Sequence, residues 1–250
     1  MKLSIITVNK NNAQGLERTI QSVINQTFRD FEYVIIDGAS TDNSVDVIKK
    51  YENKINYWIS EPDTGIYNAM NKGIRAANGE YLLFLNSGDH LVNDTVVEQV
   101  FKTAPVEDII YGNILLDCKE KIVPYKQITL KKLIKSYIPH PASFIKKQVF
   151  NRVGLYDEKY KTASDWKFFL EALILHNVTY SYIDKDITCF RSGGISTSHI
   201  TENEKQTILK ELFPRIYTDY EELFDVKNKY SKLKKSVICR FIEKLQHKFV

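Results

Sequence analysis

The sequence is poor in cysteine and contains no long apolar run. Its three cysteines, Cys118, Cys189 and Cys239, lie far apart without metal-ligand spacing, so we expect reduced thiols and no disulfide framework. No window approaches the ~20 apolar residues that a membrane-spanning helix needs. The N-terminus enters a strand-like run without a basic and apolar leader. These absences predict a soluble cytoplasmic protein and leave attachment to a membrane surface open.

Two nucleotide-binding fingerprints are also missing. A dinucleotide-binding protein should carry G-x-G-x-x-G after its first strand, yet residues 7–15 contain a single glycine, Gly15. The P-loop pattern is absent as well, so an NAD-dependent enzyme is disfavoured. The 250 residues, with a net charge of only +4, suffice for one large α/β domain or for a domain with an appendage.

Strand-like and helix-like segments alternate in the first third of the chain. This order predicts a parallel sheet with right-handed crossovers and helices on both faces, an α/β fold. We expect strands at 3–8, 31–37, 55–59 and 81–85, and helices at 13–25, 44–51 and 66–77. Further along, we expect a helix near 95–102, strands at 108–111 and 114–123, a less regular segment at 129–150, and an amphipathic helix at 164–175.

A group of consecutive polar residues directly follows the predicted central strand. Residues 81–85 are apolar at every position, and Asn86, Ser87, Gly88 and Asp89 come next. Ligands of open α/β sheets lie beyond the carboxyl ends of the strands. A carboxylate there can hold Mg²⁺ or Mn²⁺, because such ions bind through one or two carboxylates plus substrate phosphates. A simple turn with Asp89 capping the next helix is the alternative.

The first two strands end in the same way, at residues 7–12 and 37–42. Asp37 is the most informative residue of these ends, because its carboxylate can accept a hydrogen bond from the imide N–H of a pyrimidine base or from ribose. The alternative is a capping residue. Asp37 lies too far from the helix that begins at Ser44 to cap it.

Four segments, 4–12, 34–44, 60–73 and 83–89, resemble motifs of the family 2 glycosyltransferases in family order. This is a large inverting family with the GT-A fold, and the third segment is most similar to its polysaccharide and O-antigen branch. The resemblance implies a Rossmann-like, nucleotide-binding α/β sandwich with a C-terminal helical extension. Residues 1–200 would form the catalytic domain, with a nucleotide-sugar half (about 1–112) and an acceptor half (113–200), and 201–250 would form the extension.

The resemblance also implies the donor-side residues. Asp89, as the last residue of a DxD-like motif, would hold Mn²⁺ or Mg²⁺ on the donor diphosphate. Ser87 stands at the motif's first acidic position, so a single carboxylate carries the metal role. Lys72 would neutralise phosphate charge, unless it is a solvated lysine in mid-helix. The nucleotide-binding residues would be Thr7, Asn9, Asp37, Asp63, Gly65, Lys72 and Ser87.

On the acceptor side, residues 160–170 resemble the family segment that carries the catalytic base, and Asp165 is the matching residue. Inverting transfer needs a group that takes the acceptor proton. Asp165 can also simply begin a helix, where an acidic side chain is favourable. Three further residues are candidate contacts: Trp166 as a sugar-stacking or acceptor surface, His140 in a loop near the acceptor, and His199 near the diphosphate.

The C-terminal segment is basic. From Lys227 onward, eight Lys or Arg residues oppose the single acidic residue Glu243, and apolar residues recur at helical spacing. This pattern predicts a helix over residues 227–250. The helix would lie in the interface of an anionic membrane, or it would pack on the catalytic domain or on a second subunit of a homo-oligomer. No motif for nucleic-acid binding is found.

Together these features predict a metal-dependent inverting glycosyltransferase of the hexosyltransferase type. We expect a UDP-sugar as donor and a glycan or lipid-linked acceptor, in surface polysaccharide biosynthesis. The alternative is a noncatalytic nucleotide-sugar or glycan-binding protein on the same fold. The presence of both Asp89 and Asp165 argues against it, because a binding protein needs no base.

Overall fold

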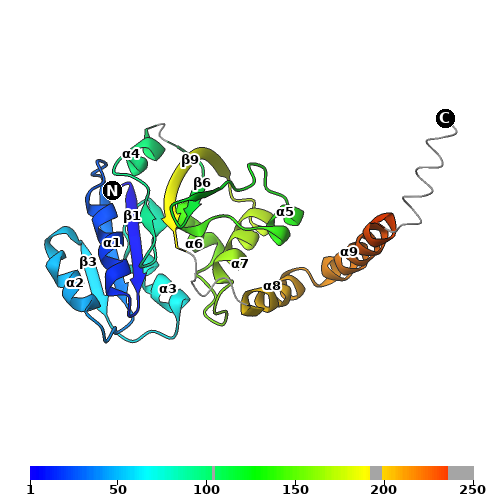
Figure 1. The fold of residues 1–250 in the computed structure, drawn as a ribbon, viewed down its shortest axis with the longest axis horizontal. Coiled ribbons are helices and arrows are strands. Elements are labelled where there is room, and N and C mark those ends of the chain that lie inside the picture. Colours follow the sequence, from blue (N-terminus) through cyan, green and yellow to red (C-terminus); the bar gives the residue numbers. More distant parts are fainter. Residues whose placement is uncertain (103–104, 192–198, 236–250) are drawn as a thin grey trace. The chain divides into compact units, whose positions relative to one another are not determined.

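The computed structural model describes residues 1–102, 105–191 and 199–235. Contacts divide the chain into two units, Met1–Thr201 and Glu202–Val250. Strands and helices alternate over residues 3–84 of the first unit (Figure 1). Its strands are β1 (Leu3–Asn9), β2 (Phe31–Asp37), β3 (Tyr57–Ser60), β4 (Tyr81–Phe84), β5 (His90–Leu91), β6 (Ile109–Leu116), β7 (Glu120–Ile122), β8 (Ser143–Lys146) and β9 (Tyr180–Phe190). Its helices are α1 (Ala13–Ile24), α2 (Ser44–Lys50), α3 (Ile66–Ala76), α4 (Val96–Phe101), α5 (Leu130–Lys135), α6 (Lys147–Val153) and α7 (Ser164–Leu170), with 3₁₀ turns at Glu52–Lys54 and His140–Ala142.

The strands form a mixed sheet in the order β3-β2-β1-β4-β8-β6-β9-β5, with β7 paired to β6. In the first half of the sheet, β1 lies parallel to β2 and β4, and β2 lies parallel to β3. Beyond β4, strand β8 runs antiparallel to both of its neighbours, β4 and β6. Strands β6 and β9 are again parallel. The predicted α/β class and the parallel first half are confirmed.

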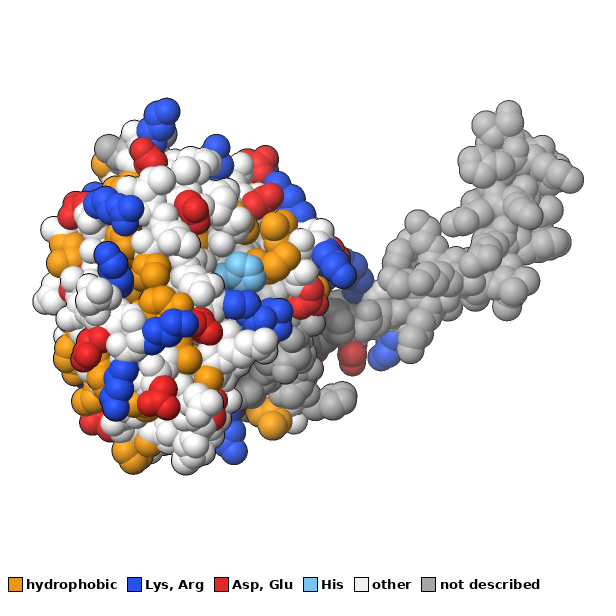
Figure 2. Space-filling view, turned by 60° about the vertical axis from the view of Figure 1, so that its left-hand side comes forward, with side chains coloured by type: hydrophobic (Ala, Val, Ile, Leu, Met, Phe, Trp, Pro, Cys, Tyr) orange, Lys and Arg blue, Asp and Glu red, His pale blue; other side chains and the backbone are white. Residues whose placement is uncertain are grey.

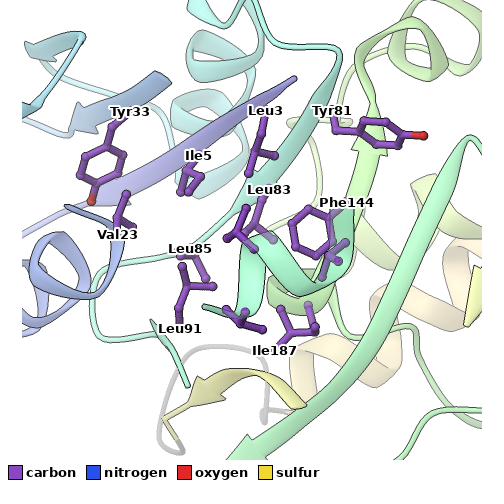
Figure 3. Close-up of a cluster of buried hydrophobic side chains, with 14 of the residues drawn as sticks. Leu3, Ile5, Val23, Tyr33, Tyr81, Leu83, Leu85, Leu91, Phe144 and Ile187 are labelled. Carbon is purple, nitrogen blue, oxygen red and sulfur yellow. The ribbon is translucent and has the colours of Figure 1, made fainter. Parts of the chain in front are cut away.

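The core lies where α1 covers the central strands. Every residue of β1 and β4 is buried. Helix α1 contributes a stripe of three apolar residues at intervals of three or four, Leu16, Ile20 and Val23, to the hydrophobic core. Figure 3 shows part of this core, with Val23 as its labelled residue from α1. Truncating a buried leucine such as Leu83 to alanine costs about 2 to 5 kcal/mol of stability. This packing holds the carboxyl ends of the strands in place.

The second half of the sheet differs from the prediction. The two strands expected at 108–111 and 114–123 are the long strand β6 followed by a turn and the short strand β7. Gly112 lies inside β6 because β9 approaches closely there: a Cβ atom would lie 2.7 Å from the carbonyl oxygen of Lys185. Strand β9 itself was not predicted. The helix expected at 164–175 is α-helical only to Leu170 and continues as a π-helix over Glu171–Leu175.

Two of the cysteines are not the free thiols that the sequence suggests. Cys118 and Cys189 form a disulfide across 71 residues of sequence, with their Cα atoms 5.0 Å apart. The prediction of reduced thiols without a disulfide is wrong for this pair. The reason is tertiary: Cys118 lies in the β6–β7 turn, which returns to the end of β9, where Cys189 pairs with Leu115 of β6. Cys239 lies outside the described residues.

The C-terminal unit contains most of α8 (His199–Leu212) and α9 (Pro214–Lys235). Pro214 separates the two helices by beginning the second, where its missing N–H has no partner to lose. The predicted membrane-surface segment, 227–250, is described only as far as Lys235. Among the described residues, no helix combines the length and apolarity required to cross a bilayer. On the face in Figure 2, the described acidic and basic side chains are interspersed with hydrophobic ones.

Candidate active site

The carboxyl ends of β1, β2 and β3 bring three polar residues together. In the sheet register Asn9 is the partner of Asp37, and Asp37 is the partner of Ser60. The same edge receives the turn that follows β4, because Ser87 N donates to Val8 O at 3.0 Å. The structure therefore brings together the strand ends that the sequence predicted to meet.

Asp37 is fully buried, and four donors already surround its carboxylate. Oδ1 accepts from Asn9 Nδ2 at 2.7 Å and from Ser40 Oγ at 2.6 Å. Oδ2 accepts from Ser40 N at 2.9 Å and from Ser60 Oγ at 2.6 Å. Burial acts to raise the pKa of Asp37, but these hydrogen bonds outweigh it, and the pKa is lowered. A base could bond to this carboxylate only after a serine hydroxyl turns away.

Asn9 and Thr7 differ in what they offer a ligand. Within the described part of the chain, Asn9 Oδ1 is buried and has no hydrogen-bond partner, so it is an available acceptor beside Asp37. Thr7 is fully buried, and its hydroxyl lies 3.0 Å from that of Tyr33. Of these two predicted nucleotide-binding residues, only Asn9 has a polar atom available at the edge.

Asp63 folds back over the end of β2. Its carboxylate lies 3.7 Å from Lys10 Nζ and accepts from Gly65 N at 3.1 Å. A Cβ atom at Gly38 would lie 2.1 Å from Asp63 Oδ2, so glycine leaves room for this contact. Gly65 has a φ of +146°, a conformation that favours glycine. Asp63 and Gly65 therefore close a loop over the predicted donor site.

Lys72 is engaged elsewhere. Its Nζ lies 2.7 Å from Glu61 Oε1 and donates to Pro62 O at 2.9 Å. The ammonium group thus fixes the loop before α3. Lys72 would have to leave both partners to reach a phosphate.

The turn after β4 is anchored on α1 and on the loop before it. Thr19 Oγ1 donates to Asp89 O at 2.7 Å and accepts from Gly88 N at 3.0 Å. Asn12 Nδ2 donates to Ser87 O at 2.9 Å. Gly88 has a φ of +113°, which lets the chain reverse tightly here. These bonds fix the backbone that carries Asp89.

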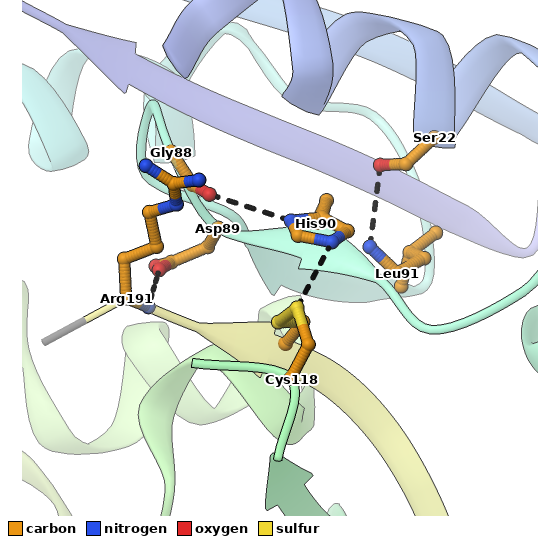
Figure 4. Close-up of a disulfide and its surroundings, with 8 residues drawn as sticks. Ser22, Gly88, Asp89, His90, Leu91, Cys118 and Arg191 are labelled. Carbon is orange, nitrogen blue, oxygen red and sulfur yellow. Dashed lines mark hydrogen bonds between the residues drawn. A yellow bond between two sulfur atoms is a disulfide. The ribbon is translucent and has the colours of Figure 1, made fainter. Parts of the chain in front are cut away.

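Asp89 is 5% exposed, and its carboxylate is weakly paired among the described residues. Within the described part of the chain, Oδ1 accepts one long hydrogen bond of 3.4 Å from Arg191 N, drawn in Figure 4. Burial raises the pKa of Asp89 to about 7. Asn86 Oδ1 is also buried and has no partner among the described residues. Oxygen donors of this kind suit Mg²⁺ or Mn²⁺, so the residues fit the predicted metal role.

Asp165 lies in the first turn of α7 and accepts a hydrogen bond from Tyr67 Oη at 2.7 Å. Burial, and then the charge of Asp165, raise the pKa of Tyr67 well above its usual value, so this hydroxyl stays a donor. Tyr67 belongs to α3, which follows the Asp63 loop. Sequence reasoning missed Tyr67, although it lies in the family-like segment 60–73.

Two of the three candidate acceptor contacts, His140 and Trp166, are buried and bonded to other protein groups. His140 is 6% exposed, with its Nε2 2.8 Å from Tyr156 Oη and its ring stacked on Phe84. Burial lowers the pKa of His140 despite the opposing charge of Asp165. Trp166 is also buried and donates from Nε1 to Leu133 O at 2.9 Å. The side chain of His199 lies outside the described residues. We therefore leave all three out of the proposed machinery.

Comparison with known proteins identifies the family of the chain. The model of the family described as "Glycosyl transferase family 2" matches residues 4–157. An uncharacterised glycosyltransferase of Mycobacterium tuberculosis is 35% identical over 181 residues, or 69% of this chain and 69% of that protein.

Two solved structures show the same fold. S. aureus TarS in complex with UDP-GlcNAc superposes with a TM-score of 0.68 at 21% identity, covering 84% of this chain and 65% of that one. The mannosyltransferase PcManGT from Pyrobaculum calidifontis, with GDP-Man and Mn²⁺, gives 0.62 at 14% identity, covering 83% and 61%. The expected Rossmann-like GT-A fold is confirmed. On the family match and the identity to its relatives, this chain belongs to glycosyltransferase family 2.

Proposed function

We propose that the protein is a metal-dependent inverting glycosyltransferase that moves a hexose from a UDP-sugar to a hydroxyl of a glycan or lipid-linked acceptor in surface polysaccharide biosynthesis. The observation that carries this proposal is the buried carboxylate of Asp89 at the strand edge, which has only one long hydrogen bond within residues 1–102, 105–191 and 199–235. A carboxylate held in this way is costly unless it serves a cation. The TarS complex with UDP-GlcNAc supports the choice of a UDP donor.

Asp89 would hold the ion, with Asn86 as a further oxygen donor. When bound, Mn²⁺ or Mg²⁺ would neutralise charge that develops on the leaving diphosphate. The complex of the Pyrobaculum enzyme with Mn²⁺ supports this choice of ion. Asn9 Oδ1, the available acceptor beside Asp37, would bind the imide N–H of the base.

Asp165 would take the proton of the acceptor hydroxyl. As that proton leaves, the acceptor oxygen attacks the anomeric carbon, the bond from this carbon to the diphosphate oxygen breaks, and the electron pair leaves with the diphosphate. The hydroxyl of Tyr67 would hold one oxygen of Asp165 and so orient the other. Inversion follows because the attacking and leaving oxygens lie on opposite faces of the sugar.

The direct test is turnover across a panel of UDP-, GDP- and dTDP-sugars with Mn²⁺. We expect hydrolysis or transfer with UDP-sugars that stops when the metal is chelated. Tight sugar-nucleotide binding without turnover on any acceptor would instead favour the noncatalytic binding protein. Equal turnover with and without Mn²⁺ would contradict the metal role.

Replacing Asp37 tests recognition of the base. Asp37→Asn puts an amide N–H among the four donors that now point at the carboxylate, which disturbs Asn9 and Ser60. Because the base would bond to the neutral Asn9 Oδ1, which Asp37 positions, we expect UDP binding to weaken by about 0.5 to 1.5 kcal/mol, the range for a neutral hydrogen bond. Calorimetry with UDP and with pyrophosphate measures it. The pyrophosphate affinity should not change, and an equal loss for both ligands would place the effect on the phosphates instead.

Tyr67→Phe removes the hydroxyl that bonds to Asp165 and keeps the ring. We expect kcat to fall by about 10- to 100-fold, since a hydrogen bond to a charged group contributes about 1.5 to 3 kcal/mol. The Kd of the donor should stay within a factor of a few. Tyr57→Phe, on the exposed Tyr57, is the matched control. Steady-state kinetics and donor titration separate the two effects, and equal kcat values for both variants would remove Tyr67 from the mechanism.

The basic tail remains a candidate membrane contact. Each basic residue near an anionic surface contributes about 1 kcal/mol, so changing Lys232, Lys234 and Lys235 to glutamine should lower vesicle binding roughly 100-fold. Sedimentation with phosphatidylserine vesicles at two salt concentrations measures it, and the binding that is lost should be salt-sensitive.

The control carries the same loss of charge on the other unit, through glutamine at the exposed Lys49, Lys54 and Lys131. This variant should bind vesicles like the wild type. If both triple variants lose binding equally, net charge alone explains it. If the tail variant changes oligomeric state instead, the segment packs on protein.

A further inference from the structure

Three potential metal ligands from different elements meet beside the Asp89 turn. His90 lies in β5, where it pairs with Cys189 of β9, and Cys118 comes from the β6–β7 turn. His90 Nε2 lies 3.5 Å from Cys118 Sγ (Figure 4). The ligand atoms of all three residues lie within 4.8 Å of one another. The sequence spacing gave no sign of this cluster, because only the fold brings its members together.

The imidazole of His90 is oriented as a ligand. Its Nδ1 lies 3.4 Å from Gly88 O, so the N–H on that nitrogen donates to the carbonyl. The lone pair of the other nitrogen, Nε2, then points to Cys118 Sγ. Histidines that bind metals commonly donate their second ring N–H to a carbonyl or carboxylate, which fixes the tautomer.

We infer that reduction of the Cys118–Cys189 disulfide opens a site in which the two thiolates and His90 Nε2 bind a thiophilic divalent cation such as Zn²⁺. In the reduction step, a dithiol reductant supplies two electrons and two protons and is itself oxidised to a disulfide. The cation then displaces the two thiol protons. Disulfide and metal complex are therefore two exclusive states of one site.

The geometry fits a tetrahedral ion. Zn–S and Zn–N bonds of about 2.3 and 2.0 Å place sulfur and nitrogen ligands about 3.6 Å apart, close to the 3.5 Å between Cys118 Sγ and His90 Nε2. The two sulfurs would have to separate to about 3.8 Å. Cys118 can supply this movement because it is exposed in a turn, whereas Cys189 is buried in β9. A water on the exposed side would complete the coordination.

This site is chemically distinct from the one at Asp89. Sulfur and imidazole ligands select Zn²⁺, whereas carboxylate and amide oxygens suit Mg²⁺ and Mn²⁺. None of the three ligands belongs to the proposed donor or acceptor machinery. The inference therefore stands whether or not the protein turns over a UDP-sugar.

Cobalt spectroscopy on the full chain tests the inference. The protein is reduced with a phosphine, stripped with a chelator and titrated anaerobically with Co²⁺. We expect a near-ultraviolet thiolate-to-cobalt charge-transfer band that saturates at one ion per chain and is lost when Zn²⁺ displaces the cobalt. The chain with its disulfide intact should show no such band. A reduced chain without the band would overturn the inference.

Three variants locate the ligands. Cys118→Ser should abolish the band, and His90→Ala, which keeps both thiols, should weaken Co²⁺ binding and shift the visible spectrum. Cys239→Ser is the matched control and should behave as the wild type. If circular dichroism shows that Cys118→Ser fails to fold, His90→Ala decides. An unchanged Co²⁺ affinity and spectrum in that variant would exclude the proposed site.

Discussion

Asp165→Asn should slow sugar transfer by about 10²- to 10⁴-fold, the usual contribution of acid–base catalysis. Asparagine keeps the size of the side chain and can still accept the hydrogen bond from Tyr67, but it cannot take a proton. The donor is bound before the base acts, so its Kd should stay within a factor of a few while kcat collapses. Single-turnover kinetics with a true acceptor, together with donor titration, measure the two quantities separately.

The control for this variant is a nearby carboxylate. Asp157 lies 3.6 Å from Lys167 of α7 and is partly exposed. Asp157→Asn removes a carboxylate of the same region and leaves the hydrogen bond between Tyr67 and Asp165 in place, so kcat should change little. Near-normal turnover by Asp165→Asn would mean that another group takes the proton and would remove Asp165 from the mechanism.

Asp89→Asn should stabilise the metal-free protein at neutral and alkaline pH while removing its response to Mn²⁺. Burial raises the pKa of Asp89 from 3.8 to about 7, so ionisation of this carboxyl disfavours the folded state. In the wild type, the contribution of the protonated Asp89 to the free energy of unfolding should therefore be fully present below about pH 4. It should be lost as the pH rises through about 7. At 1.36 kcal/mol per pKa unit the loss is on the order of 4 kcal/mol.

Denaturant unfolding of both proteins across this pH range, with and without Mn²⁺ and UDP, gives the comparison. In the asparagine variant, the pH-dependent loss assigned to Asp89 should be absent. In the wild type at pH 8, Mn²⁺ with UDP should raise the free energy of unfolding, since a ligand that binds only the folded state stabilises it. If Asp89→Asn keeps this gain, the ion is held elsewhere. If its stability follows the wild-type pH curve, Asp89 is not the group that titrates.

The first half of the fold could be predicted because its signals are local. Buried strands such as 81–85 and amphipathic helices such as α1 can each be recognised from one continuous segment of sequence. Their alternation then predicts a parallel sheet. Strands β8 and β9 were not predicted, because β8 is short and β9 does not alternate regularly between buried and exposed positions. Their identity as strands depends on partners far away in the sequence.

The site divides in a similar way. The meeting of Asn9, Asp37 and the Asp89 turn followed from strand polarity alone. The hydrogen bond between Tyr67 and Asp165 joins residues 98 positions apart, so no local sequence pattern predicts it. Trp166 was predicted as a sugar-binding surface from its residue type alone. In the structure it is buried against α5, and its indole N–H donates to Leu133 O, a contact that the sequence does not reveal.

The order of strands in the sheet bears on how the chain folds during synthesis. Strands β1 to β4 find their parallel partners among residues 3–84, so this half can assemble as soon as it leaves the ribosome. The outer edge of β4 must then wait for β8, and β6 must wait for both β8 and β9. Until then an apolar strand edge, Tyr81–Phe84, stays open to pairing with other chains. Chains truncated between β4 and β8 should therefore aggregate more than chains that include β8.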